Sequence, residues 1–243
     1  MKSNRIFSLI DKVIYEYNLI EDGDRILIGA SGGKDSTLLC EYFSNRMKRL
    51  TGVKVNPGEA RFQFKALHIQ SEITQPLDKS LCALFDKWNV PYESIEINVQ
   101  ERLAPGKKMS CYWCSCQRRK ELFLYARENG FNKIALGHHL DDVLETLIMN
   151  STLHGELSTM TPRLKFNKFP VTVIRPLYYV GEEMIINHAE KENWKKITCT
   201  CDFQENSDRK GARQKLEVLT DHNFDTKLRL LSSLKKIKTD YLP

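Results

Sequence analysis

Strand-like and helix-like segments alternate along most of this chain, and this alternation constrains the fold more than any other feature. Short apolar runs that are typical of buried strands lie at 25–29, 62–69, 92–99, 133–137 and 171–174. Segments with the apolar spacing of helices lie at 4–20, 37–49, 76–88, 118–129, 141–153 and 182–193. This order predicts an α/β fold with a doubly wound parallel sheet. Ligands bind beyond the carboxyl ends of the strands in such sheets, so residues that directly follow a strand are candidates for a site.

The 243 residues are expected to form one α/β domain with a helical addition at each end. We predict an N-terminal helix over 1–24, the α/β domain over 25–200 and a basic helical extension over 201–243. Between 205 and 243 the chain has nine Lys and Arg against six Asp and Glu. This pattern fits either a solvated helix face or a surface for nucleic acid.

Composition excludes a membrane protein and permits a nucleic-acid partner. No apolar run approaches the roughly 20 residues that span a bilayer, and the first residues lack the apolar core of a signal peptide. We therefore expect a cytoplasmic location and no membrane partner. The net charge is +6, and the segment 102–120 has six basic residues and no acidic one. Such a basic segment is typical of a surface that meets nucleic acid.

A loop rich in Gly and Ser follows the first predicted strand. It contains, in order, Ala30, Ser31, Gly32, Gly33, Lys34, Asp35 and Ser36. Paired glycines let the backbone turn tightly and present N–H groups to an anion, and the next helix adds its positive N-terminal end. It is not a Walker A loop, because Asp35 follows Lys34 where that loop has Ser or Thr. The alternative is a connection without function, but the strand–loop–helix setting favours a phosphate site.

A second polar segment follows the fourth predicted strand. It contains, in order, Gly137, His138, His139, Leu140, Asp141 and Asp142. Adjacent carboxylates beside a polyphosphate would hold Mg²⁺, which prefers carboxylate and phosphate oxygens. The structural alternative is that Asp141 is the N-cap of the following helix. The location at the same edge of the sheet favours the magnesium site.

Five of the seven cysteines fall in two clusters: Cys111, Cys114 and Cys116, then Cys199 and Cys201. A disulfide framework is not expected in a cytoplasmic chain. The first cluster is expected just before the helix that begins near 117. A Cys-x-x-Cys pair either chelates a metal or acts as a redox dithiol, and neighbouring cations favour both uses because they lower thiol pKa values. A metal site would take a further ligand from the second cluster, whereas a thioredoxin-like dithiol leaves the phosphate loop unexplained.

The segment 31–36 resembles the PP-loop of the N-type ATP pyrophosphatases, and 137–142 is similar to the Gly-His-x-x-Asp-Asp segment of these enzymes. They cleave ATP between the α- and β-phosphates and transfer AMP to a substrate oxygen. The resemblance implies that 25–200 is a PP-loop domain. It implies catalytic roles, with Mg²⁺, for Lys34, Asp35, Asp141 and Asp142. It implies nucleotide binding by Ala30, Ser31, Gly32, Gly33, Lys34, Asp35, Ser36, Gly137 and His138, with the adenine against the edge formed by Leu67, His68 and Ile69.

From about 18 to 219 the chain resembles one branch of this superfamily, the TtcA-like tRNA 2-thiocytidine synthetases. The segments 20–25, 134–139 and 174–177 carry this resemblance, together with Cys111-x-x-Cys114 followed by Arg118 and Arg119. In this branch three cysteines hold a 4Fe–4S cluster, and the fourth iron is free to bind sulfur. The resemblance therefore implies an Fe–S cluster at this cysteine pair.

Cys111 and Cys114 match two of the three cluster ligands, and Cys114 also counts among the implied catalytic residues. The third ligand is Cys201, whose spacing to Arg209 fits the family, or Cys199. Zinc is an alternative to the cluster, because thiolates bind both. No Cys/His pairs occur at the two ends of the sequence, which favours the cytidine branch over the uridine-thiolating one.

The resemblance predicts an ATP-dependent tRNA sulfurtransferase that adenylates a 2-carbonyl oxygen, releases pyrophosphate and replaces the oxygen with sulfur. The expected partners are tRNA, a sulfur donor (a cysteine desulfurase or sulfide) and, as an open option, a second copy of the chain. Three alternatives remain: a 2-thiouridine synthetase, an amidating enzyme such as a tRNA lysidine synthetase, and a nucleotide-sensing zinc protein. Tyr112 and Trp113 either stack on the extruded base or pack under their loop.

Overall fold

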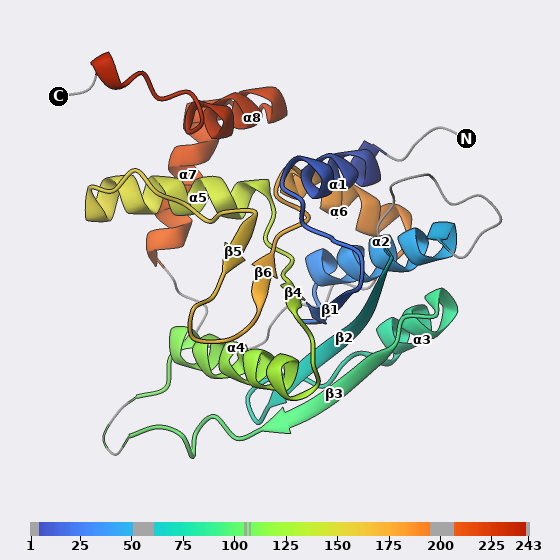
Figure 1. The fold of residues 1–243 in the computed structure, drawn as a ribbon. Helices are drawn as coiled ribbons and strands as arrows, with labels where there is room; N and C mark the ends of the chain where they lie inside the picture. The colour runs from blue at the N-terminus through green and yellow to red at the C-terminus, as the bar shows by residue number, and fades with distance from the viewer. Residues whose placement is uncertain (1–4, 51–60, 105, 107, 195–206, 242–243) are drawn as a thin grey trace.

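A six-stranded sheet organises the molecule (Figure 1). The computed structural model describes residues 5–50, 61–104, 106, 108–194 and 207–241. The strand order is β3-β2-β1-β4-β6-β5. The strands are β1 (Asp24–Gly29), β2 (Phe62–Ser71), β3 (Tyr92–Ile97), β4 (Lys133–Ala135), β5 (Arg163–Lys165) and β6 (Thr172–Ile174). All neighbouring strands pair in parallel except β5 and β6. The predicted doubly wound α/β sheet is confirmed, and β5 adds an antiparallel edge that the sequence did not predict.

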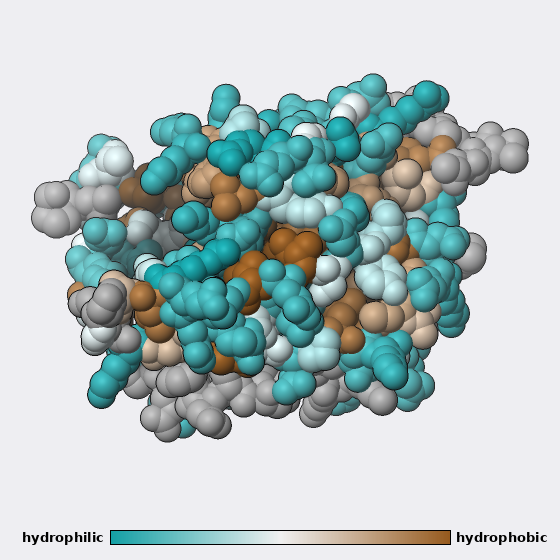
Figure 2. Space-filling model, turned by 90° about the horizontal axis from the view of Figure 1, so that it is seen from below, coloured by the Kyte–Doolittle hydropathy of each residue, from teal (hydrophilic) through white to brown (hydrophobic). Residues whose placement is uncertain are grey.

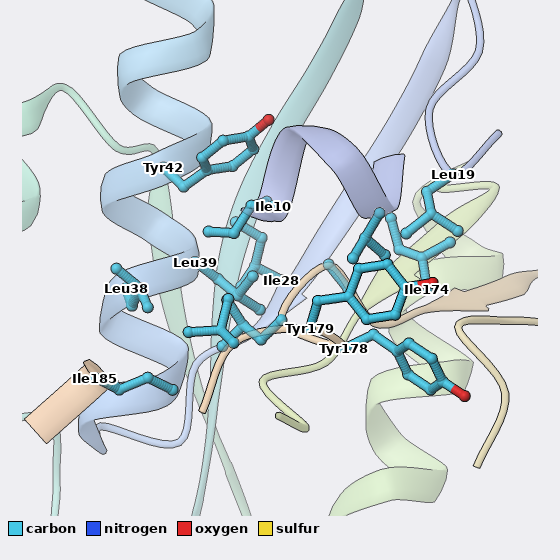
Figure 3. Close-up of a cluster of buried hydrophobic side chains, with 14 of the residues drawn as sticks. Ile10, Leu19, Ile28, Leu38, Leu39, Tyr42, Ile174, Tyr178, Tyr179 and Ile185 are labelled. Carbon is cyan, nitrogen blue, oxygen red and sulfur yellow. The ribbon is translucent and has the colours of Figure 1, made fainter. Parts of the chain in front are cut away.

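Helices cover both faces of the sheet, because alternate residues of the central strands point to opposite sides. In β1, Ile26 and Ile28 pack in one cluster and Leu27 in the other. The first cluster is covered by α1 (Arg5–Glu16), α2 (Lys34–Leu50), α3 (Lys79–Trp88) and α6 (Glu182–Lys191). Figure 3 shows Ile10 of α1, Leu39 of α2 and Ile185 of α6 in the cluster that contains Ile28. The second is covered by α4 (Cys111–Glu128), which lies on the opposite side of the sheet in Figure 1.

The start of α4 differs from the prediction. The cysteine cluster was expected before a helix near 117, but the helix begins at Cys111 and includes all three cysteines. Ser110 is the N-cap, and its hydroxyl accepts a hydrogen bond from the Trp113 N–H at 3.1 Å. The first turns mix exposed residues such as Tyr112 and Ser115 with the buried Cys114, so they lack the apolar spacing that predicts a helix. The Ser N-cap was the available signal.

The C-terminal helices pack on α5 (Leu140–Met149) at the far end of the sheet. A one-turn π-helix, Asn150–His154, continues α5. The helices α7 (Ser207–Thr220) and α8 (Phe224–Ser233) insert Ala212, Leu216 and Leu231 into the larger core cluster. A short 3₁₀ turn at Thr239–Tyr241 follows. The basic end of the chain is therefore partly integrated into the core.

The surface on the side of α4 and β3 is mostly hydrophilic, with apolar side chains visible only in separate patches (Figure 2). None of the helices in the described ranges is long and apolar enough to cross a bilayer.

Candidate active site

The Gly/Ser loop lies between the carboxyl end of β1 and the N-terminus of α2, as predicted. Gly32 has a φ of 87°, in the left-handed region that favours glycine. Hydrogen bonds of two serine side chains stabilise the turn. The hydroxyls of Ser31 and Ser36 are 3.1 Å apart, and the Ser36 hydroxyl also donates to the Gly33 carbonyl at 3.0 Å. Ser36 is buried and Ser31 is exposed. Backbone N–H groups at this helix start and the Ser31 hydroxyl form a suitable anion site.

Lys34 and Asp35 begin α2 and form an ion pair. The Lys34 Nζ lies 3.2 Å from Asp35 Oδ1 and 3.0 Å from Glu182 Oε1. Burial by itself lowers the pKa of Lys34, but the two carboxylates outweigh it and the pKa is raised. Burial raises the pKa of Asp35, whose Oδ1 is buried and accepts no hydrogen bond. Glu182 was not predicted, because it is 148 residues from Lys34.

Gly137 brings the end of β4 against the phosphate loop. A Cβ at this position would lie 3.1 Å from the Ser36 nitrogen and 3.2 Å from Asp35 Cβ. Only glycine therefore allows this approach without a shift of the loop. The result places His139 Nε2 4.0 Å from Asp35 Oδ1.

The two adjacent carboxylates have different partners. The N-cap of α5 is His139 and not Asp141, and Asp142 completes a capping box by accepting the His139 N–H at 3.1 Å. Asp141 accepts from Lys227 Nζ at 2.6 Å and from the Glu182 N–H at 2.7 Å. Burial opposes ionisation of Asp141, but these two donors prevail and its pKa is lowered. The structural alternative, that Asp141 is the N-cap of this helix, is therefore wrong, because His139 is the N-cap.

A cavity of about 200 Å³ opens beside the loop. Its walls come from four elements that meet at the carboxyl edge of the sheet, namely Gly29, Ala30, Ser31, Leu67, Ile69, Ser115, Arg118, Arg119, Leu122, Leu136 and His138. We call it the nucleotide cavity. Arg118 closes one side by donating from Nε to the Ile69 carbonyl at 2.9 Å.

The predicted nucleotide-binding residues divide between this cavity and its surroundings. Ala30, Ser31 and His138 line it, whereas Gly32 and Lys34 line a smaller hollow beside α3. His68 does not line it. Its ring is buried behind the loop with Nδ1 2.8 Å from the Ala30 carbonyl, and its strand neighbours Leu67 and Ile69 face the cavity instead. Of the three residues at the predicted adenine edge, Leu67 and Ile69 therefore line the cavity and His68 does not, because side chains alternate along β2.

A second cavity of about 440 Å³ adjoins the first. Both are lined by Ser115, Arg119, Leu136 and His138. The remaining walls of the second cavity are Phe123, Met160, Phe166, Val173, Arg175 and Arg209. We call it the lateral cavity. The sequence did not predict it, because its walls come from α4, the β5–β6 hairpin and α7, which are far apart in the chain.

The Cys-x-x-Cys pair occupies the first turn of α4, where residues three apart share one face of the helix. Cys114 is buried with Sγ 3.9 Å from the Ser71 hydroxyl at the end of β2, and Cys116 is half-buried. Cys199 and Cys201 lie outside the described residues, so the third ligand stays a prediction. Among the side chains that the structure describes, no three His, Cys, Asp or Glu form a group that could hold a metal ion.

The two aromatic residues between the cysteines differ in exposure. Trp113 lies in α4, is half-buried and donates from Nε1 to the Val99 carbonyl at 3.4 Å, in the segment that follows β3. Tyr112 is 80% exposed. The packing alternative therefore holds for Trp113, and Tyr112 remains accessible.

Comparison with known proteins supports the arrangement. The PP-loop domain family matches residues 4–218. A tRNA-cytidine(32) 2-sulfurtransferase of Coxiella burnetii is 31% identical over 98% of this chain and 91% of its own length. A protein of the same name from Nitrosospira multiformis is 34% identical over 98% of this chain and 78% of its own length.

A solved structure shares the fold. It is the U34-tRNA thiolase NcsA from Methanococcus maripaludis with its [4Fe-4S] cluster, with a TM-score of 0.73 and 19% identity over 97% of this chain and 80% of that one. At this identity the likeness concerns the fold alone. The sequence relatives are closer, and they confirm the resemblance from the motifs. The chain belongs to the PP-loop domain family and, within it, to the family of the tRNA-cytidine(32) 2-sulfurtransferases.

Proposed function

We propose that this protein forms 2-thiocytidine in tRNA with the use of ATP, as the name of its relatives indicates for them. The 2-carbonyl oxygen of the base bonds to the α-phosphorus of ATP, and pyrophosphate leaves. Sulfur at the oxidation level of sulfide then attacks carbon 2, and the carbon–oxygen bond breaks as AMP departs with the electron pair. Adenylation thus turns a poor leaving oxygen into a good one.

One observation carries this proposal: the phosphate loop and the cysteine-bearing helix line the same cavity. Ser31 of the loop and Ser115 of α4 are both in its wall, and Cys114 directly precedes Ser115. Activation on the loop and sulfur delivery from α4 would therefore take place at one edge of the sheet. Catalysis by such a site rests on holding the reactants together.

The nucleotide cavity offers groups for each part of ATP. The phosphates fit the N-terminal end of α2 and the Ser31 hydroxyl. The adenine fits the apolar walls that Leu67, Ile69 and Leu122 provide. Arg119 at its rim favours the negative charge that develops during phosphoryl transfer.

Asp35 is the side chain that fits Mg²⁺ best. Its Oδ1 is buried and accepts no hydrogen bond, although Lys34 Nζ lies 3.2 Å away, and a carboxylate oxygen of this kind is a preferred ligand of a hard cation. Asp142 and Asp141 are further candidates, and both already accept hydrogen bonds: Asp142 from the His139 N–H and Arg209, and Asp141 from Lys227 and the Glu182 N–H. The ion, when bound, would neutralise the polyphosphate. Through its contacts with the Glu182 N–H of α6 and with Lys227 of α8, Asp141 would hold these two helices beside the site.

Cys111 and Cys114 are suited to a 4Fe–4S cluster, because both belong to the first turns of α4 and thiolates are soft ligands. We assign the third ligand to Cys201 or Cys199. The cluster, when bound, would supply an iron that holds the incoming sulfur. Zinc in its place is the alternative, and sulfide or a cysteine desulfurase is the proposed donor.

The test is anaerobic reconstitution with iron, sulfide, ATP, Mg²⁺ and tRNA, followed by nucleoside mass spectrometry and metal analysis. We expect 2-thiocytidine, with one AMP and one pyrophosphate for each base. Lys34→Ala should abolish AMP formation. Cys114→Ser should lose metal and thiolation but keep ATP binding. The matched control, Cys82→Ser on α3, should keep all three.

The outcomes separate the alternatives. A 2-thiouridine or amidated product would assign the chain to another PP-loop activity, and nucleotide binding without tRNA-dependent AMP would indicate a sensor. Full thiolation by Cys111→Ser or Cys114→Ser would contradict the cysteine-centred part. The possibility of a dimer is tested separately by light scattering of the reconstituted protein.

A further inference from the structure

The lateral cavity has walls that the activation of ATP does not use. Four residues line both this cavity and the nucleotide cavity, so a molecule bound there lies close to the nucleotide cavity. Its volume of about 440 Å³ is within the roughly 300–1,000 Å³ of small-molecule sites. In Figure 1 its walls correspond to α4, the β5–β6 hairpin above it and the near end of α7.

One side of the cavity is apolar and aromatic. Phe123 and Phe166 lie with ring centroids 4.7 Å apart, and Met160 and Val173 continue this wall. Phe123 is buried and Phe166 is half-buried, so an incoming ring can cover the exposed part of Phe166. Flat apolar walls of this kind are typical of sites that hold an unstacked nucleobase.

The lining of the cavity also includes a buried cation, Arg175. Arg175 is 8% exposed, and no carboxylate of the described residues lies within ion-pair distance of it. Burial and the nearby Arg119 lower its pKa. A buried charge without a counter-charge costs stability, so its presence beside a cavity indicates a ligand that accepts hydrogen bonds.

Arg175 also fixes the orientation of His138. Its Nη1 donates to the Thr161 carbonyl at 2.5 Å, and its Nε donates to His138 Nδ1 at 3.4 Å. Burial lowers the pKa of His138 to about 4, with Arg175 adding to the effect, so the ring is neutral near pH 7. Since Nδ1 accepts, the ring proton is on Nε2, and His138 is a donor at the boundary of the two cavities.

We propose that the lateral cavity receives the target cytosine and that Arg175 and His138 select it over uracil. This proposal rests on the function proposed above. Cytosine has two adjacent ring acceptors, O2 and N3, which a pair of donors can satisfy. Uracil has a donor at N3, which would face another donor and leave both groups unpaired.

The same arrangement aims the reacting oxygen. With its ring against Phe166 and its acceptor edge toward His138, cytosine presents O2 to the boundary with the nucleotide cavity. Arg119 and Arg209, at the rim, suit the phosphates on either side of the extruded nucleotide. The edge of cytosine that carries O2 and N3 would then be both the edge that is recognised and the edge that is adenylated.

The test uses two RNA stem–loops that differ only by cytidine or uridine at the target position. RNA-dependent pyrophosphate release is measured, because this step needs neither sulfur nor the cluster. For the wild type we expect a strong preference for cytidine. Arg175→Met should lower the rate with cytidine by roughly 10- to 100-fold and reduce the preference over uridine, while ATP affinity stays within about twofold.

Two further variants keep the test independent of folding. Met160→Trp fills the cavity and should block RNA-dependent pyrophosphate release while ATP binding persists. Arg229→Met, on the exposed side of α8, is the matched control and should behave as the wild type.

Unchanged rate and unchanged cytidine preference in Arg175→Met would overturn the base pocket and leave the proposed function intact. If the wild type releases no pyrophosphate with any tRNA, the proposed function fails, and the pocket assignment fails with it. Loss of ATP binding in Met160→Trp would show that this cavity belongs to the nucleotide and would also overturn the proposal.

Discussion

At the scale of single residues, the site depends on close approaches that leave no room for substitution. Gly137 lies against the backbone of Ser36 and the side chain of Asp35, so the loop and the β4 end are fitted to each other. Lys34, in turn, is held by Asp35 and Glu182 and points along the helix start. The position of the phosphate loop is therefore set by its neighbours as well as by its own glycines.

Gly137→Ala should weaken ATP binding by at least tenfold. The added Cβ would meet the Ser36 nitrogen at 3.1 Å, and relief of this clash must shift the loop, at a cost of about 1–3 kcal/mol. Titration with a fluorescent ATP analogue measures the effect.

The control is Gly211→Ala in α7, where an added Cβ meets nothing within 4 Å. It should leave ATP affinity unchanged and raise the free energy of unfolding by up to about 1 kcal/mol, because Ala favours the helix. Equal ATP affinity in both variants would contradict the account of Gly137.

At the scale of elements, α4 and α8 connect distant parts of the sequence to the site. The first turn of α4 carries the cysteine pair and depends on the Ser110 cap, while α8 is tied to α5 through the Lys227–Asp141 ion pair. The Ser110 cap and the Lys227–Asp141 ion pair can each be tested by one substitution.

Ser110→Ala should reduce metal retention more than global stability. Loss of the N-cap costs about 0.5–2 kcal/mol, and it frays the turn that holds Cys111 and Cys114. The rate of iron loss to a chelator, compared with the denaturation midpoint, measures this difference. Asn223→Ala removes the equivalent cap of α8 and should leave metal retention unaffected; a similar rate of iron loss in both variants would contradict the prediction.

The Asp141–Lys227 pair should make part of the stability dependent on pH. The pKa of Asp141 is lowered in the folded state, so its contribution is present above the ordinary pKa near 4 and is lost as pH falls through and below that value. Denaturant unfolding of the wild type and Asp141→Asn should differ by about 1–3 kcal/mol at pH 6, and the difference should shrink toward pH 3.

Asp225→Asn is the control for this pair, since Asp225 is exposed in the first turn of α8. It should change the unfolding free energy by less than about 1 kcal/mol. A wild-type advantage over Asp141→Asn that stays constant between pH 6 and pH 3 would show that the charge of Asp141 is not involved.

The elements that could be predicted are those with apolar periodicity. Strands β1, β2, β3, β4 and β6 were predicted from their apolar runs, and the phosphate loop was predicted from its distinctive turn after β1. The three exposed residues of β5 carry no such pattern, and their pairing depends on β6. Pairs such as Lys34–Glu182 and Asp141–Lys227 are fixed only by the fold, since 148 and 86 residues separate their members.

At the scale of the whole molecule, three arginines lie around the two cavities, and one of them, Arg209, also pairs with Asp142 at 3.4 Å. Arg119 and Arg209 lie at the rim of the lateral cavity, and Arg118 closes the nucleotide cavity. The net charge of +6 adds a weaker general attraction for RNA. Binding of tRNA should thus depend strongly on salt.

A plot of the logarithm of the tRNA association constant against the logarithm of the salt concentration should be linear. Its negative slope should be roughly 0.7–0.9 for each phosphate contact. Arg119→Met should reduce this slope by about one contact, because its guanidinium is exposed at the rim. Filter binding between 50 and 300 mM salt measures the slope. Arg61→Met, just before the amino end of β2, is the control and should keep the wild-type slope. An equal slope for Arg119→Met and the wild type would show that Arg119 does not contact a phosphate of the RNA.

The wall shared by the two cavities has a consequence for inhibition. Both cavities are lined by Ser115, Arg119, Leu136 and His138. The adenylated base would therefore be one ligand that occupies both cavities. A stable compound that joins adenosine monophosphate to a pyrimidine would combine both halves without a second association cost. Such a bisubstrate mimic should bind far more tightly than either fragment, and its linker length would report the span between the two compartments.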